Sequence, residues 1–272
     1  MNTLSVAGDV APLVVESLLL EQRRGGIGFL TLNRPAQYNA LSKEMLAALQ
    51  AALDALSIDA SVRVVVLGGA GKAFCAGHDL KQMKANPSLE YYRSLFDDCS
   101  RLMMRIQTLP QPVIARIHGT ATAAGCQLVA MCDLAVAAED ARFAVSGVNV
   151  GLFCATPSVA LSRNVGRKAA FEMLVTGEFI DAATALQHGL INRCVPAERL
   201  DQEINRLALA IAAKPPSVIA AGKALFYRQL ERDIGSAYQL AGEAMACNMI
   251  DEIAQEGVAA FIEKRAPNWG PD

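Results

Sequence analysis

The sequence predicts an α/β domain followed by an all-helical C-terminal segment. Three short apolar stretches, at residues 63–67, 112–117 and 134–137, have the composition of buried strands. A segment in which apolar residues recur at helical spacing precedes each of them, at 42–56, 87–108 and 125–131. Beyond Pro196 only helical patterns remain, at 200–213, 217–231 and 236–265. Alternating strands and helices followed by helices alone indicate a core domain at 13–195 and a helical segment at 196–272.

Local signals predict the remaining elements. A strand pair at 13–20 and 27–32 is expected around the turn Arg23-Arg24-Gly25-Gly26. Ser42 and Asp181 have the residue type of helix N-caps, and Asp79 with Gln82 forms a capping pair. Residues 143–150 are expected to be irregular, with helices at 157–161, 168–175 and 182–188. In the helix ending at residue 108, five side chains are expected to face inward: Leu95, Cys99, Leu102, Met103 and Ile106.

Composition sets limits on partners and location. The 272 residues are 53% hydrophobic and 19% charged, with a net charge of -2, so a large core is expected. This balance argues against nucleic acid or an anionic membrane as a partner. Seven scattered cysteines with no CxxC pair indicate reduced thiols. The first twelve residues contain Asp9 and no Lys or Arg, and no apolar run reaches the roughly 20 residues of a membrane span, so a cytoplasmic location is expected.

Two stretches of small residues are the candidate functional elements. His118 to Leu128 joins a predicted strand to a predicted helix, and residues 68–80 do the same earlier in the chain. Small side chains let a ligand approach the backbone closely, and the free N–H groups at a helix start favour an anion or a developing oxyanion. One such turn is equally compatible with a tight packing corner, but two of them favour a binding site.

Several other site types lack their motifs in this sequence. No GxSxG nucleophile elbow, Walker A or GxGxxG sequence is present. No HExxH sequence or Cys/His cluster suggests a metal site, so no metal is expected. Two backbone N–H donors converging on one oxygen remain the best interpretation.

The motifs in these stretches resemble the enoyl-CoA hydratase/isomerase (crotonase) superfamily. The resemblance rests on Phe74-Cys75-Ala76-Gly77-His78-Asp79-Leu80, on Gly125-Cys126-Gln127-Leu128, and on flanking motifs such as Leu32-Asn33-Arg34-Pro35 and Phe261-Ile262-Glu263-Lys264-Arg265. It covers residues 15–267 and implies a spiral of ββα units, with the helical C-terminal segment serving trimerisation. It also implies a homotrimer or hexamer and an acyl-CoA thioester as ligand. Coenzyme A then enters as part of the substrate, and no separate cofactor is expected.

The resemblance also assigns residues. The amides of His78 and Ala124 would hold the thioester oxygen and stabilise its enolate form. The adenine end of coenzyme A would lie against Ala76, Gly77 and His78, next to Asp79 and Leu80. Phe261 and Lys264 would reach a coenzyme A of a neighbouring subunit. Arg34 and Lys72 are candidate partners for its phosphates, although such basic residues are commonly just solvated surface charges.

The sequence departs from the family at the two usual glutamates. Their positions are occupied by Gln127 and Gly147. Hydration of an enoyl-CoA needs groups that activate water and deliver a proton, which neither a neutral amide nor glycine supplies. His78 and His118 are the titratable side chains nearest the predicted amides, with Cys126 and Cys154 behind them. For His118 a hydrogen-bonded structural role is the stronger interpretation, and for both cysteines core packing is.

Three functions therefore remain open. The protein is an acyl-CoA enzyme of fatty-acid or related metabolism that uses other acid/base groups, or it catalyses a reaction that needs only enolate stabilisation, such as decarboxylation of a malonyl-CoA-type substrate. The third possibility is an acyl-CoA-binding protein without turnover. In each case ordinary hydratase activity is expected to be weak.

Overall fold

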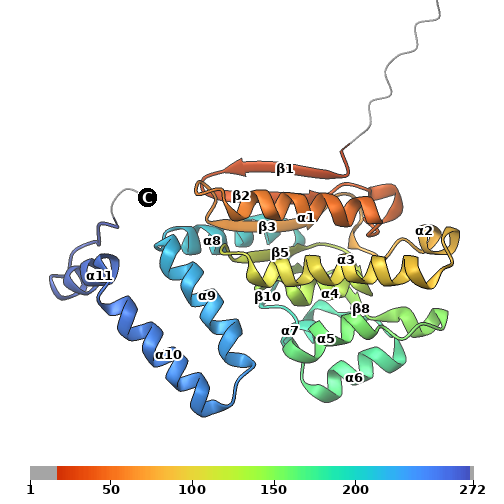
Figure 1. Ribbon diagram of the computed structural model, residues 1–272. Coiled ribbons are helices and arrows are strands. Elements are labelled where there is room, and N and C mark those ends of the chain that lie inside the picture. Colours follow the sequence, from red (N-terminus) through yellow and green to blue (C-terminus); the bar gives the residue numbers. More distant parts are fainter. Residues whose placement is uncertain (1–16, 270–272) are drawn as a thin grey trace, which may run out of the picture.

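A six-stranded sheet forms the centre of the computed structural model, which describes residues 17–269 (Figure 1). Its strand order is β1-β2-β3-β5-β7-β10. The first two strands form an antiparallel hairpin and the others run parallel. The strands are β1 Leu19–Arg24, β2 Ile27–Leu32, β3 Val64–Gly69, β5 Val113–Ile117, β7 Leu134–Ala138 and β10 Arg193–Val195.

The first strand and the turn of the N-terminal hairpin differ in extent from the sequence prediction. Its turn is Gly25–Gly26, where both residues adopt positive φ, and β1 runs on to Arg24 where the prediction ended it at Leu20. A two-residue turn of this type matches the twist of the paired strands and favours glycine. The predicted strand residues 13–16 lie outside the described residues.

A second, four-stranded sheet was not predicted. It has the order β4-β6-β8-β9, with β4 Ala73–Cys75, β6 Thr120–Thr122, β8 Arg142–Ala144 and β9 Ile180–Asp181. The first three of these strands each follow a strand of the main sheet after a tight turn. At Gly119 the turn needs glycine, because φ is +61° and an added Cβ would overlap the carbonyl oxygen of Lys72. Strand pairs followed by helices repeat along the chain, as in a ββα spiral.

Helices cover both faces of the main sheet. On one face α1 (Lys43–Ser57) and α3 (Leu89–Thr108) pack against the core, and all five side chains expected to face inward from α3 are buried. On the other face α8 (Leu200–Ala212) buries Leu200, Ile204 and Ala208 against β3 and its neighbours. Successive side chains of β3 therefore point alternately into two hydrophobic cores, one on each face of the sheet, as expected for a central parallel strand.

The capping signals are largely confirmed. Ser42 accepts a hydrogen bond from Met45 N at the start of α1, and Asp181 does so from Thr184 N at α7 (Ala182–Gln187). The predicted helix at 236–265 is two helices, because Asp251 caps a new one by accepting from Ile253 N. The remaining helices are α2 Leu80–Ala85, α4 Ala124–Met131, α5 Ala155–Asn164, α6 Arg167–Thr176, α9 Pro216–Leu230, α10 Ile234–Met249 and α11 Glu252–Ile262, with 3-10 turns at Pro35–Gln37, Ser146–Val150 and Ala197–Arg199.

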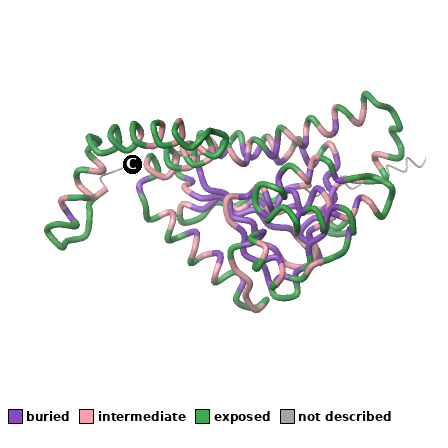
Figure 2. The backbone as a smooth tube through the Cα atoms, turned by 90° about the horizontal axis from the view of Figure 1, so that it is seen from below, coloured by how far each residue is buried: buried purple, intermediate pink, exposed green. Residues whose placement is uncertain are grey.

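The last three helices extend away from the body of the molecule and are mostly exposed (Figures 1 and 2). A partly buried polar cluster ties the first of them, α9, to the core. Lys223 of α9 donates to Asp133 (2.6 Å) and to the carbonyl oxygens of Ile106 and Gln111, and Tyr227 donates to the same carboxylate (2.8 Å). The division at residue 195 stays a prediction, and α8 packs on the main sheet although it follows that boundary.

Within residues 17–269 no single helix has the length and hydrophobicity of a membrane span. The helical stretches 197–212 and 216–230 would satisfy both criteria only together, and they are bent by 101° at their junction.

Candidate active site

The two small-residue turns meet in the folded chain. Gly77, in the turn after β4, has φ +90°, and a Cβ added there would lie 2.9 Å from Ala123 Cβ and 3.2 Å from Ala124 N. A side chain at this position would therefore separate the turns. On the far side Gly125 is packed so closely on β4 that an added Cβ would lie 2.9 Å from Cys75 Cβ. Glycines thus bring the backbone at His78 next to the start of α4.

The amides of His78 and Ala124 are available to a ligand. Leu41 bridges the residues on either side of His78, donating to Gly77 O (2.8 Å) and accepting from Asp79 N (3.2 Å). Ala124 is the first residue of α4, where an N–H has no intrahelical partner. Throughout the described part of the chain, neither N–H has an acceptor.

Ala123 is strained between these two amides. It adopts φ 51° and ψ −120°, a conformation that non-glycine residues rarely occupy. Its N–H donates to Ala144 O (2.9 Å), and its carbonyl oxygen accepts from Gln127 N (3.0 Å). The surrounding hydrogen bonds therefore hold the strained turn that orients Ala124 N.

A cavity of about 230 Å³ opens in front of both amides. It lies between the His78 turn, the start of α4 and the 146–157 segment. Most of its lining is apolar, and the polar side chains are a histidine, two hydroxyls and a thiol. No Asp, Glu, Lys or Arg belongs to the lining. The lining residues are Ala76, His78, Leu80, Met83, Phe96, Ala123, Ala124, Ser146, Gly147, Val150, Leu152, Phe153, Cys154, Ala155, Thr156 and Pro157.

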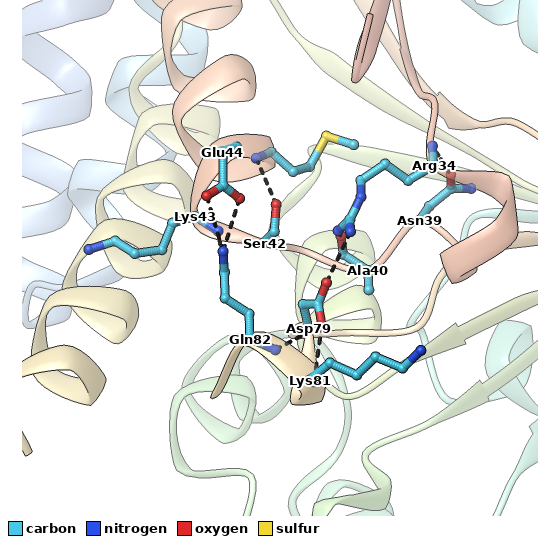
Figure 3. Close-up of polar contacts among 10 residues, drawn as sticks. Arg34, Asn39, Ala40, Ser42, Lys43, Glu44, Asp79, Lys81 and Gln82 are labelled. Carbon is cyan, nitrogen blue, oxygen red and sulfur yellow. Dashed lines mark hydrogen bonds and ion pairs between the residues drawn. The ribbon is translucent and has the colours of Figure 1, made fainter. Parts of the chain in front are cut away.

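A polar network fastens the His78 turn to the segment before α1 (Figure 3). Asp79 caps α2 by accepting from Lys81 N (3.1 Å) and Gln82 N (3.2 Å), and its other oxygen accepts from Arg34 Nη2 at 3.0 Å. Burial raises the pKa of Asp79, but the hydrogen bond from Gln82 N and the guanidinium of Arg34 outweigh it and hold the pKa below its ordinary value. The network therefore keeps a charged cap directly after the His78 amide.

The Gln82 side chain does not complete the predicted reciprocal cap. Its Oε1 accepts from Lys43 N (2.9 Å) and its Nε2 donates to Glu44 (3.0 Å), so it links α2 to α1 (Figure 3). The guanidinium of Arg34 also has partners within the chain. Its Nη1 donates to Ala40 O (2.9 Å), and it forms an ion pair with Asp79. Phosphate binding by Arg34 stays a prediction, while Lys72 is exposed on the turn after β3.

The two positions of the usual glutamates line different cavities. Gly147 lines the cavity of the two amides, in a loop where its N–H donates to Cys154 Sγ (3.3 Å) and its carbonyl oxygen accepts from Leu152 N (2.9 Å). Gln127 is buried on α4 and instead lines a neighbouring cavity of about 350 Å³. Its Oε1 is shielded and has no hydrogen-bond partner among residues 17–269. Thr156 lines both cavities.

The histidines have different environments. His78 lines the cavity and its ring stands edge-on to Phe96. Both ring nitrogens are shielded from solvent, and burial lowers the pKa of the ring by more than the backbone of Leu41 raises it. Burial lowers the pKa of His78 to about 4, so the ring is neutral at physiological pH. His118 is not part of the cavity lining and joins Gly71 O (2.9 Å) to Arg116 Nη1 (3.3 Å). Since a guanidinium only donates, Nδ1 of His118 accepts and its Nε2–H donates to Gly71 O, a structural role.

Neither cysteine near the site is activated. Burial raises the pKa of Cys126 to about 12. Burial also raises the pKa of Cys154, which outweighs the hydrogen bond from Gly147 N. Both side chains are therefore neutral thiols at physiological pH.

Two predicted ligand residues lie far from the cavity in the single chain. Phe261 is at the end of α11 and is 85% exposed, and Lys264 follows with φ +56°. In Figure 1 α11 lies at the opposite end of the molecule from α5, whose N-terminus borders the cavity.

Sequence reasoning missed the apolar wall formed by Met83 and Phe96 and the hydroxyl of Ser146. Only the proximity of Tyr91, Tyr92 and Phe96 in the sequence hinted at that wall.

Comparison with known proteins identifies the family. A family model described as enoyl-CoA hydratase/isomerase matches residues 22–272. The chain belongs to the enoyl-CoA hydratase/isomerase family. "Enoyl-CoA hydratase domain-containing protein 3, mitochondrial" of Xenopus laevis is 48% identical over 252 residues, covering 93% of this chain and 86% of the relative. The resemblance read from the motifs is therefore confirmed, and family membership supports an enzyme of the crotonase superfamily.

Solved structures confirm the crotonase fold. An enoyl-CoA hydratase of Mycobacterium smegmatis superposes with a TM-score of 0.92 at 65% identity, covering 93% of this chain and 99% of the other. Human enoyl-CoA hydratase domain-containing protein 3 superposes with a TM-score of 0.91 at 45% identity, covering 93% and 100%. The ββα spiral expected from the motifs is thus the observed architecture.

The expected cytoplasmic location is wrong. Relatives from Xenopus laevis, Rattus norvegicus, Mus musculus, Homo sapiens and Danio rerio all carry the word mitochondrial in their names. These relatives point to mitochondria. The expectation rested on the charge of the first twelve residues, and a location signal is an address that is read separately from the fold.

Proposed function

We propose that this protein binds an acyl-CoA thioester with its thioester oxygen between the amides of His78 and Ala124. The observation that carries the proposal is the contact of two turns with unpartnered N–H groups at the mouth of one cavity. Two such donors stabilise an enolate oxygen, and each typically contributes about 3 kcal/mol to a transition state. Low polarity around them strengthens that interaction.

The cavity lining suits the acyl part of such a ligand. Leu80, Met83, Phe96 and Phe153 surround a space larger than the roughly 150 Å³ cavity that holds a benzene molecule. The rest of coenzyme A would pass over the backbone of Ala76 and Gly77 toward Lys72. Phe261 and Lys264 would reach it only from a neighbouring subunit of a homotrimer or hexamer, because they lie far from the cavity of their own chain.

Ordinary hydration is expected to be slow at this site. No carboxylate lines the cavity, and the imidazole of His78 is too weakly basic to accept a proton efficiently at neutral pH. General acid–base catalysis usually contributes a factor of about 100 or more. We therefore expect the turnover of a simple enoyl-CoA to fall short of a two-carboxylate hydratase by at least that factor.

The same lining favours one second candidate, decarboxylation of a malonyl-CoA-type thioester. In that step the bond between Cα and the carboxylate breaks, carbon dioxide leaves and the electron pair becomes the enolate that the two amides stabilise. No base has to remove a proton from the substrate. A lining without carboxylates is compatible with this step, whereas it leaves ordinary hydration without its usual acid/base pair.

Proline at position 124, combined with glycine at 123, tests the proposal. Ala123→Gly/Ala124→Pro removes one N–H at the first residue of α4, and glycine at 123 removes the Cβ that at ψ −120° would clash with the proline ring. We expect acetoacetyl-CoA to bind to the full-length protein in isothermal titration calorimetry, and the variant to bind at least tenfold more weakly. Arg167→Pro, at the exposed first residue of α6, is the matched control and should bind normally.

Circular dichroism and thermal unfolding must show that both variants are folded. Equal affinity of Ala123→Gly/Ala124→Pro and the unaltered protein would refute a role for the Ala124 amide. Crotonyl-CoA hydration, followed by the loss of its conjugated thioester absorbance, and release of carbon dioxide from malonyl-CoA then separate the two activities. Binding without either reaction would indicate a non-catalytic acyl-CoA-binding protein.

A further inference from the structure

The second cavity, of about 350 Å³, continues the cavity of the two amides along the same helices. Both are lined by α3, α4 and α5, and α4 packs against the other two (Figure 1). On each helix a residue of the second cavity follows a residue of the first by three or four positions: Ser100 follows Phe96, Gln127 follows Ala124, and Val159 follows Thr156. That spacing is about one helical turn, a rise of about 5.4 Å. The two cavities therefore lie end to end along the three helices.

Thr156 stands between the two cavities. It lines both of them, and in the described part of the chain no other lining residue is shared. A β-branched side chain has few χ1 rotamers in a helix, so it does not turn aside easily. The backbone beneath it is also held, because the buried Pro157 fixes its own φ and Ser158 N donates to Cys154 O (2.9 Å). Thr156 is thus a stiff partition in the first turn of α5.

Hydrocarbon would be favourable on the far side of this partition. Met103, Met131 and Val159 give the second cavity apolar surface, and methionine adapts readily to the shape of a ligand. Its two charged residues, Arg163 and Glu231, pair with each other at 3.5 Å, and both side chains are more than half exposed. The second cavity is therefore usable by an acyl chain that can enter it.

We propose that Thr156 sets the acyl chain length of this protein, and that the site takes a short acyl group that ends against Thr156. This inference rests on the proposed function, because it takes the amides of His78 and Ala124 as the anchor of the thioester oxygen. A chain that starts at those amides and follows α4 and α5 meets Thr156 before it reaches the second cavity.

The size of the first cavity gives the expected limit. A cavity of about 150 Å³ holds one benzene molecule, or about 25 Å³ for each carbon. At that density the 230 Å³ of the first cavity hold about nine atoms other than hydrogen. The oxygen and sulfur of the thioester take two of them, which leaves about seven carbons. A hexanoyl group therefore fits in front of Thr156, and a decanoyl group does not.

A series of straight-chain thioesters tests the partition. We would measure Kd by titration calorimetry for acetyl-, butyryl-, hexanoyl-, octanoyl- and decanoyl-CoA with the full-length protein. Affinity should rise up to about fourfold per methylene as far as hexanoyl-CoA, the gain expected for a buried CH₂, and less than about twofold from there to decanoyl-CoA. In Thr156→Ala, which joins the cavities and suits a helix, the rise should continue and reach at least about tenfold between hexanoyl- and decanoyl-CoA.

Two variants are matched controls. Thr156→Val keeps the shape of the side chain and removes only its hydroxyl, and Val159→Ala enlarges the second cavity without opening the partition. Both should keep the limit at hexanoyl-CoA. Thr156→Leu, which extends the partition, should shorten the limit to butyryl-CoA and tests the inference independently if Thr156→Ala does not fold, as judged by thermal unfolding.

The outcomes separate this inference from the proposed function. An affinity that rises through decanoyl-CoA in the unaltered protein would overturn the inference, and so would a limit that stays at hexanoyl-CoA in Thr156→Ala or Thr156→Leu. A limit that moves in either control would show that the volume at position 156 does not set it. In all of these results thioesters still bind, and the proposed function stands. Failure of every thioester to bind would refute the proposed function, and the inference with it.

Discussion

Gly147 is where the structure prevents restoration of the usual second glutamate. A Cβ added at this position would lie 2.7 Å from Cys154 Sγ and would overlap the carbonyl oxygen of Leu152. Favourable carbon contacts lie at about 3.5–4.0 Å, so the sulfur alone would have to retreat by roughly 1 Å. The Leu152 oxygen is a backbone atom that cannot rotate away. Any side chain at 147 therefore requires the loop 146–154 to change its conformation.

The cost follows from this overlap. Overpacking usually costs about 1–3 kcal/mol, and a clash with backbone places Gly147→Ala at the upper end, at about 3 kcal/mol. For a chain of this size each kcal/mol shifts Tm by about 2–4 °C, so we expect a decrease of about 6–12 °C. Thermal unfolding at one fixed protein concentration measures it. Gly166→Ala is the matched control, because nothing lies within 4 Å of its added Cβ and Tm should barely change.

Restoring the two glutamates, by Gln127→Glu and Gly147→Glu, tests the same steric argument through hydratase activity. The first change places a carboxyl on the neighbouring cavity without a partner, where burial raises its pKa, and we expect it to increase crotonyl-CoA hydration little. The double variant should be destabilised at least as much as Gly147→Ala and should remain a poor hydratase. If it unfolds at the Tm of the unaltered protein and hydrates crotonyl-CoA about 100-fold faster, the steric argument is wrong.

Three further predictions concern stability. Ala123→Gly should raise the free energy of unfolding by about 1 kcal/mol, because relief of a strain of about 1–3 kcal/mol exceeds the glycine entropy cost, and urea unfolding would measure it. Lys223→Met should lower it by about 3 kcal/mol by leaving the Asp133 carboxylate buried without its cation, a loss that exposed Lys168→Met should not reproduce. Because burial lowers the pKa of His78 from 6.5 to about 4, only the unfolded chain gains a proton between these values. Stability should thus fall by about 3 kcal/mol as the pH decreases from 6.5 to 4, and His78→Leu should remove that part of the slope in urea titrations at several pH values.

Strongly periodic elements were predictable from the sequence. The inward face of α3 is an example, since its five predicted residues are all buried. The second sheet was not, because β4 and β6 each have only three residues and lie inside the two stretches that were interpreted as turns. The break before α11 depends on Asp251 acting as a cap within a continuous helical pattern, and periodicity alone does not reveal it.

The candidate site, too, was predictable from the sequence only in part. Contact between the two turns was predictable, because glycine and alanine at a strand–helix junction constrain the backbone itself. The direction of Gln127 and the pairing of Arg34 with Asp79 depend on packing between segments far apart in the sequence. Spacing placed both residues near the turns, yet it could not show that Gln127 lines a second cavity.

This difference between backbone and side chain has a chemical consequence. The N–H groups at His78 and Ala124 are properties of the chain path, so they persist whichever side chains occupy those positions. The acid/base groups of a hydratase are side chains, and at Gly147 the chain path now excludes one. If the amides hold a thioester oxygen as proposed, proton transfer within the cavity must come from the substrate, from water or from the neutral side chains of the lining, which are those of His78, Ser146, Cys154 and Thr156. Reactions that generate an enolate without removing a proton therefore fit this site better than addition of water.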